Sequence, residues 1–155
     1  MRSLEWADPA GTPPPPVFLH DSRITEVRCE KNAVTFCFAD GFSLVENGQL
    51  TRAVRGFVTF SDCQPSDFFV WRVTGHPSRY GLQLRGKEIP LEALDRRFFA
   101  RHGFIELFAE MYSPDRMHWR GVLYLPQKRL WPRMNSYIVI ETMGCYPMTF
   151  FWEYL

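Results

Sequence analysis

FIELFAEMYSPDRMHWRGVLYL, at residues 104–125, is the stretch that decides the fold. Two runs rich in aromatic and aliphatic residues flank a Ser-Pro-Asp sequence at residues 113–115, which has the chemistry of a tight turn. In the first run Ile105, Leu107 and Met111 alternate with charged and aromatic residues, as in a strand that buries one face. The stretch therefore predicts a β-hairpin.

The register of this hairpin can be predicted, because a slip of one residue would exchange its two faces. Pairing Glu110 with Arg120, and Tyr112 with His118, gives one apolar face and one face where opposite charges meet. A register shifted by one residue would set Glu110 against Trp119. We therefore predict the first register. Its core residues are Ile105, Leu107, Met111, Trp119 and Leu123.

The rest of the chain adds strands on both sides of one helix. Lys31-Asn32 suits a two-residue turn that pairs Val27 with Phe36 and Thr25 with Phe38. Residues 75–89 are predicted to be a loop with at most a short extended piece. Strands are predicted at residues 23–30, 33–38, 42–45, 53–60, 68–74, 136–142 and 148–154.

The helix is predicted at residues 90–102. Pro90 suits a first helical position, Leu94 and Phe98 belong to an apolar stripe, and Gly103 ends the helix. The fold class is therefore α+β and mainly β, in the order ββββ(β)-α-ββββ. Antiparallel meanders would form a β-sandwich or a strongly bent sheet.

The 155 residues suit one domain. Residues 1–17, which contain four consecutive prolines, predict a proline-rich N-terminal arm, and residues 18–155 a single β-rich domain. The net charge of +1 favours neither nucleic acid nor an acidic partner. Free thiols are expected at Cys29, Cys37, Cys63 and Cys145, because no C-x-x-C pair is present. Without a secretory signal or an apolar span, the chain is expected to be cytoplasmic.

Catalysis is not predicted. The four histidines have no metal-ligand spacing with another His or Cys, and no phosphate loop, dinucleotide fingerprint or nucleophile elbow occurs. Glu106 and Glu110 on one strand would lie about 13 Å apart, at roughly 3.3 Å per residue. A two-carboxylate site needs roughly 5–9.5 Å. We therefore expect no enzyme, no cofactor and no metal site.

Two binding hypotheses remain. Exposed Tyr, Trp and Arg dominate interface energetics, which favours a protein partner. The candidate partner-binding residues are Asp62, Asp67, Glu106, Glu110, Tyr112 and Asp115. The alternative is binding of single-stranded nucleic acid by charge and stacking. The candidate residues for it are Arg96, Arg97, Arg101, Lys128, Arg129 and Trp131.

Three short motifs carry a resemblance: Leu-His-Asp-Ser-Arg-Ile at residues 19–24, Glu-Met-Tyr at 110–112 and Trp-Arg-Gly at 119–121. With the β-meanders, they make the chain similar to small bacterial immunity proteins of contact-dependent growth inhibition and related polymorphic toxin systems. Some of these have a four-strand, helix, four-strand order that resembles the Whirly single-strand-binding fold. The resemblance implies a cytosolic inhibitor that occludes the active site of a cognate toxin. Immunity proteins against nucleases are often acidic, whereas this chain is near neutral.

Overall fold

The computed structural model describes residues 1–6, 15–113, 115–126, 133–144 and 146–154. Its strands and helix are β1 (Arg2–Trp6), β2 (Val17–Phe18), β3 (Arg23–Glu30), β4 (Ala33–Phe38), β5 (Ser43–Glu46), β6 (Gln49–Arg52), β7 (Arg55–Ser61), β8 (Phe68–Ser78), β9 (Gly81–Ile89), α1 (Glu92–Arg97), β10 (Phe104–Ser113), β11 (Arg116–Leu125), β12 (Arg133–Thr142) and β13 (Met148–Glu153). Short 3-10 helices lie at Pro65–Asp67 and Phe99–Arg101.

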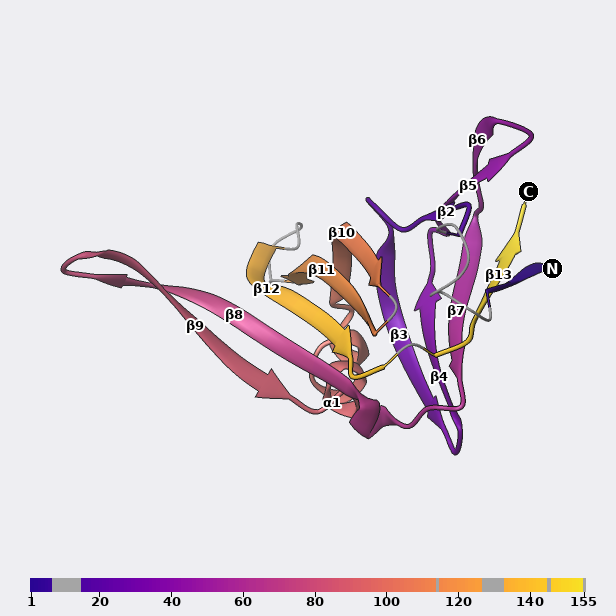
Figure 1. The fold of residues 1–155 in the computed structure, drawn as a ribbon. Helices are drawn as coiled ribbons and strands as arrows, with labels where there is room; N and C mark the ends of the chain where they lie inside the picture. Colours follow the sequence, from indigo (N-terminus) through magenta and orange to yellow (C-terminus); the bar gives the residue numbers. More distant parts are fainter. Residues whose placement is uncertain (7–14, 114, 127–132, 145, 155) are drawn as a thin grey trace.

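Ten strands form one antiparallel sheet, in the order β1-β13-β7-β4-β3-β10-β11-β12-β8-β9, and β2, β5 and β6 form a small second sheet. Between β3 and β10 the described residues form two strand pairs, Ile24–Ile105 and Arg23–Glu106, and the large sheet bends there (Figure 1). We call the strands from β1 to β3 in that order the first half-sheet, and those from β10 to β9 the second half-sheet. The predicted class, mainly β with antiparallel strands and one short helix, is confirmed.

Aromatic rings from the two half-sheets meet between them. Trp119 on β11 packs edge-on against Phe36 on β4 and Phe60 on β7, with ring centroids 5.1 and 5.6 Å apart. Phe68 on β8 contacts the same two phenylalanines. All four rings are buried. Because each aromatic ring buries about 150–250 Å², this cluster buries a large apolar surface from both half-sheets.

The helix is shorter than predicted. Helix α1 is followed by the 3-10 turn, and His102, in the left-handed region at a φ of 60°, ends the segment one residue before the predicted Gly103. Asp95 accepts a hydrogen bond from the backbone N–H of Val27 at 3.3 Å, which ties α1 to β3.

The hairpin at residues 104–125 forms as predicted, but its predicted register is wrong. Glu110 pairs with Trp119 and not with Arg120, and Tyr112 pairs with Met117. Next to the turn Ser113 pairs with Arg116, which sets a register one residue away from the predicted one. A β-bulge between Leu107 and Ala109 then adds one residue to β10 without a counterpart in β11 and shifts the register by one more residue. An alternating pattern gives no sign of such an insertion.

The bulge lies at Phe108, and side chains beyond it change face. Met111, predicted in the core, is 54% exposed, whereas Glu110 and Tyr112 are largely covered. The other predicted core residues are buried as expected: Ile105, Leu107, Trp119 and Leu123.

A second bulge explains the partial success of the other predicted hairpin. Val27 pairs with Phe36 as predicted. At the far end, however, Phe38 pairs with Ile24 and not with Thr25, because the register shifts between Ile24 and Glu26.

The separate N-terminal arm predicted at residues 1–17 is wrong for residues 2–6. These residues form β1, which pairs with β13 at the edge of the first half-sheet. Trp6 is 7% exposed, and its ring meets that of Tyr112 edge-on at 5.1 Å. Most of the proline-rich run, residues 7–14, lies outside the described residues.

Strands β8 and β9 form a long hairpin that projects from the body of the molecule (Figure 1). The loop predicted at residues 75–89 is therefore wrong, since nearly all of it is strand. The β9 strand is the last in the large sheet, and every residue from Gly81 to Glu88 is exposed.

Candidate protein-binding face

The predicted partner-binding residues on β10 do not share one face. Glu106 lies before the bulge and accepts a hydrogen bond from Arg23 Nε at 2.9 Å. Glu110 lies beyond it, where its carboxylate accepts hydrogen bonds from the Leu19 N–H and the Tyr112 hydroxyl, each at 2.8 Å. Burial raises the pKa of Glu110 and that of Tyr112. Both carboxylates therefore have structural partners inside the protein.

Of the three other predicted residues, Asp67 and Asp115 lie at one end of the second half-sheet, and Asp62, directly after β7, lines a hollow together with Asp67. The backbone carbonyl of Asp67 accepts the N–H of Met143, directly after β12. Asp115 lies in the turn that leads into β11, and β11 begins beside the end of β12. Asp62 and Asp115 are exposed, and Asp67 is half-buried. We call these three residues the acidic rim.

The second half-sheet packs one side on the core and leaves the other open. Alternation along the strands places a set of exposed side chains on the open side. We call this surface the outer face, and it is formed by Trp71, Leu82, Leu84, Phe108, Met111, Arg120 and Tyr137. Six of the seven are apolar, with exposed fractions from 37% for Trp71 to 70% for Leu82.

The bulge in β10 helps to build the outer face. It leaves Phe108 40% exposed and turns Met111 outward. The ring of Phe108 then meets Tyr137 of β12 edge-on, with centroids 6.2 Å apart. Trp71 continues the face on β8, opposite Val139 of β12. The apolar side chains thus extend across neighbouring strands and do not stand singly.

The projecting hairpin continues this surface. Leu82 of β9 lies over Gly75 of β8, where an added Cβ would come within 3.0 Å of Leu82 Cδ1. Leu84 lies directly opposite Gly75, and both leucines are about two-thirds exposed. At the tip, Tyr80 is 89% exposed. The projecting hairpin extends well beyond the body of the molecule (Figure 1), and these exposed apolar side chains lie on it.

One cation stands among the apolar residues of the outer face. Arg120 is exposed and pairs across the sheet with Val139 and Ala109. Within the described ranges, no carboxylate forms an ion pair with it. His118 and Glu141, nearby on the same face, are hydrogen-bonded to each other through Nδ1 and Oε1.

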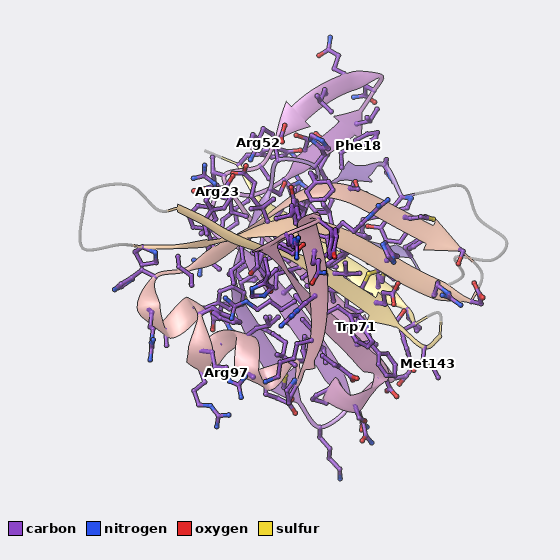
Figure 2. The ribbon with its side chains drawn as sticks, turned by 90° about the vertical axis from the view of Figure 1, so that its left-hand side faces the viewer. Phe18, Arg23, Arg52, Trp71, Arg97 and Met143 are labelled. Carbon is purple, nitrogen blue, oxygen red and sulfur yellow. The ribbon has the colours of Figure 1, made fainter. Side chains whose placement is uncertain are left out.

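The residues predicted for nucleic acid are only partly placed by the structure. Arg96, Arg97 and Arg101 line a hollow of about 560 Å³, which we call the arginine hollow. Its other lining residues are Arg72, Phe98, Leu125 and Pro126. Arg72 lines this hollow, and its neighbour Trp71 points to the opposite side of β8, so the hollow is separate from the outer face. Figure 2 shows Arg97 beside the helix and Trp71 away from it. Lys128, Arg129 and Trp131 lie outside the described residues.

The described part of the chain holds no group of three or more His, Cys, Asp or Glu side chains arranged for a metal. None of its helices has the length and apolar character needed to cross a membrane. The thiols of Cys29, Cys37 and Cys63 are free. Comparisons with protein-family models, curated proteins and solved structures find no match to this chain.

Sequence reasoning missed most of the outer face. Trp71 and Tyr137 were assigned to strands without a binding role, and Leu82 and Leu84 to a loop. One signal was available, because residues 68–74 carry bulky side chains on both faces. Bulky side chains on both faces predict a central strand. The structure covers only the side that contains Val70.

Proposed function

We propose that this chain is an immunity protein, a binding protein without catalytic activity that neutralises a cognate toxin by covering the toxin's active site. The partner we expect is the C-terminal toxin domain of a large secreted effector, met in the cytoplasm. The outer face is the observation that supports the proposal best. Contiguous exposed apolar side chains with polar groups at their margins are typical of protein interfaces.

The chemistry of the outer face defines the partner surface. Trp, Tyr and Arg are the residue types that most often carry binding energy at protein interfaces. Trp71 and Tyr137 would supply the apolar contact. A carboxylate on the toxin would pair with Arg120, since burying this cation without a partner would cost binding energy. We therefore expect an apolar toxin surface that carries an acidic residue near its centre.

The acidic rim gives this interface a second feature. Asp115 directly precedes β11, Asp67 is hydrogen-bonded to Met143 after β12, and Asp62 lines a hollow with Asp67. Charges at the margin of an interface mainly change the association rate and its salt dependence. Neutralising the rim should therefore slow association, whereas truncating the central aromatics should speed dissociation.

The test is co-purification of the chain with the toxin domain encoded beside it, followed by binding kinetics. Tyr137→Ala is the informative variant and Phe18→Ala its matched control, because the two side chains are 46% and 47% exposed on different sheets. We expect Tyr137→Ala to weaken binding by about 2 kcal/mol, roughly thirtyfold. Phe18→Ala should bind like the parent protein.

A second readout is the survival of cells that express the toxin. The parent chain and Phe18→Ala should protect these cells, and Tyr137→Ala should protect them less. Absence of both binding and protection would rule out the immunity function. The toxin would be shown to dock elsewhere if its binding were unchanged in each of the three outer-face variants, Tyr137→Ala, Trp71→Ala and Arg120→Ala.

A further inference from the structure

We propose that the arginine hollow binds the phosphate groups of a nucleotide. Three separate segments form it: Arg72 comes from β8, the other arginines from α1 and the 3-10 turn, and Leu125 and Pro126 from the end of β11. None of the lining residues that the structure describes is acidic. Four guanidinium groups around one hollow make a strongly anion-attracting site.

The structure separates these arginines from the acidic residues that are close to them in sequence. Asp95 turns toward β3, where it accepts the N–H of Val27 at 3.3 Å. Glu92 lines a different hollow, with Glu88 and Pro65. Burial is the main cause that raises the pKa of Cys29 on β3, and the charges of Glu92 and Asp95 raise it further. Both carboxylates therefore lie toward β3. The acids of the helix therefore do not neutralise the hollow.

One of the arginines is held in place. Arg72 Nε donates to Ser136 Oγ at 3.0 Å, and its guanidinium lies over the ring of Phe98 at 5.3 Å from the centroid. A guanidinium fixed in this way loses little conformational entropy when it binds an anion. For Arg96, Arg97 and Arg101, the described residues include no ion-pair partner, and all three side chains are exposed.

The shape and the apolar lining suit a nucleotide better than inorganic phosphate alone. A volume of about 560 Å³ falls within the roughly 300–1,000 Å³ of small-molecule sites. Leu125 and Pro126 offer apolar surface beside the cations. A base can stack on a guanidinium plane while its phosphates contact the other arginines. The phosphates could belong to a free nucleotide or to the end of a nucleic-acid strand.

Calorimetric titration with three probes tests the proposal on the whole chain: pyrophosphate, ATP and a 5′-phosphorylated oligothymidylate. We expect ATP or the oligonucleotide to bind more tightly than pyrophosphate, and affinity to fall as salt rises. Arg97→Ser with Arg101→Ser should weaken binding at least about tenfold. The control variant Arg79→Ser with Arg85→Ser removes the same amount of charge from the projecting hairpin and should change the binding affinity little.

Each outcome is informative. ATP binding without oligonucleotide binding identifies a free nucleotide, and the converse identifies a strand end. The single variant Arg97→Gln and thermal melts guard against loss of folding. Failure of all three probes to bind, or equal losses in both double variants, would overturn the proposal. The proposal would also be overturned if the parent chain bound no nucleotide while the double variant Arg97→Ser/Arg101→Ser lost toxin binding. Toxin binding measured with Tyr137→Ala is independent of this result.

Discussion

Glu110 Oε1 accepts a hydrogen bond from the backbone N–H of Leu19 at 2.8 Å, joining β10 to a segment 91 residues earlier in the chain. Two backbone hydrogen bonds continue the contact, from Asp21 N to the carbonyl of Leu107 and from Leu107 N to that of Ser22. These bonds lie beside the narrow junction of β3 and β10. The Leu-His-Asp-Ser sequence at residues 19–22 is therefore part of the joint between the half-sheets.

Two replacements of Glu110 distinguish the contribution of its hydrogen bonds to stability from the contribution of its charge. Glu110→Ala leaves the Leu19 N–H without its acceptor and should lower the free energy of unfolding by about 1–3 kcal/mol. Glu110→Gln keeps an acceptor oxygen and should be much less destabilising. Urea denaturation of both variants measures this difference, and equal losses would show that the charge, rather than the hydrogen bond, is what matters.

The same carboxyl predicts a dependence of stability on pH. Burial is the main reason that the folded-state pKa of Glu110 lies above 4.5. The stabilising contribution of this group is therefore complete below about pH 4.5 and is lost as pH rises through the raised pKa. Relative to Glu110→Gln, the parent protein should lose stability as pH rises toward neutrality. A pH-independent difference between the two would contradict this.

Gly41 and Gly48 provide a matched test of backbone approach. Both have positive φ, of +66° and +76°, but a Cβ on Gly41 would lie 2.0 Å from the carbonyl oxygen of Ala53, whereas one on Gly48 meets nothing. Gly48→Ala should cost only the left-handed conformation, about 1–2 kcal/mol. Gly41→Ala adds a backbone clash and should cost more than about 3 kcal/mol. Similar denaturation midpoints for the two variants would show that the turn at Gly41 can relax.

Two tryptophans should differ sharply in their effect on stability. Trp119 is fully buried between Phe36 and Phe60, so Trp119→Ala should cost about 3–5 kcal/mol. Trp71 is 37% exposed on the outer face, and Trp71→Ala should cost about 1 kcal/mol or less. Thermal melts compare them. A large loss for Trp71→Ala would mean that this ring supports the fold, and its use as a binding probe would then fail.

The buried thiols should react slowly in the folded protein. Burial raises the pKa of Cys37 and of Cys63 to about 11, so little thiolate forms at mildly alkaline pH. Cys29 is exposed, with a pKa raised less, and should be alkylated first. Mass spectrometry of a Cys145→Ser variant treated with iodoacetamide, with and without denaturant, measures the order. Equal rates in the folded state would contradict the burial of Cys37 and Cys63.

Much of the fold was predictable because its strands follow simple alternation between marked turns. The turn at Lys31-Asn32 and the burial of Trp119 and Leu123 followed from the residues alone. The bulges in β3 and β10 were not predictable in this way. A bulge changes register without changing composition, and its position depends on contacts with strands far away in sequence.

The candidate site was less predictable, for a related reason. Reading β10 without its bulge placed Glu110 and Tyr112 outward and Met111 inward, the reverse of the structure. It therefore favoured carboxylates as the binding surface. The projecting ribbon was missed because β9 alternates in polarity without burying either side, so its pattern resembles that of a polar loop.

The position of β13 between β1 and β7 constrains the order of folding. During synthesis, β1 and β7 are made long before β13, the strand at residues 148–153 with which both of them pair. Contacts between such distant segments slow folding, because loop closure must precede any gain from pairing. We therefore expect nascent chains that lack β13 to expose unpaired backbone groups at the edge of the sheet. Such chains should need chaperone protection until β13 has been synthesised and can pair.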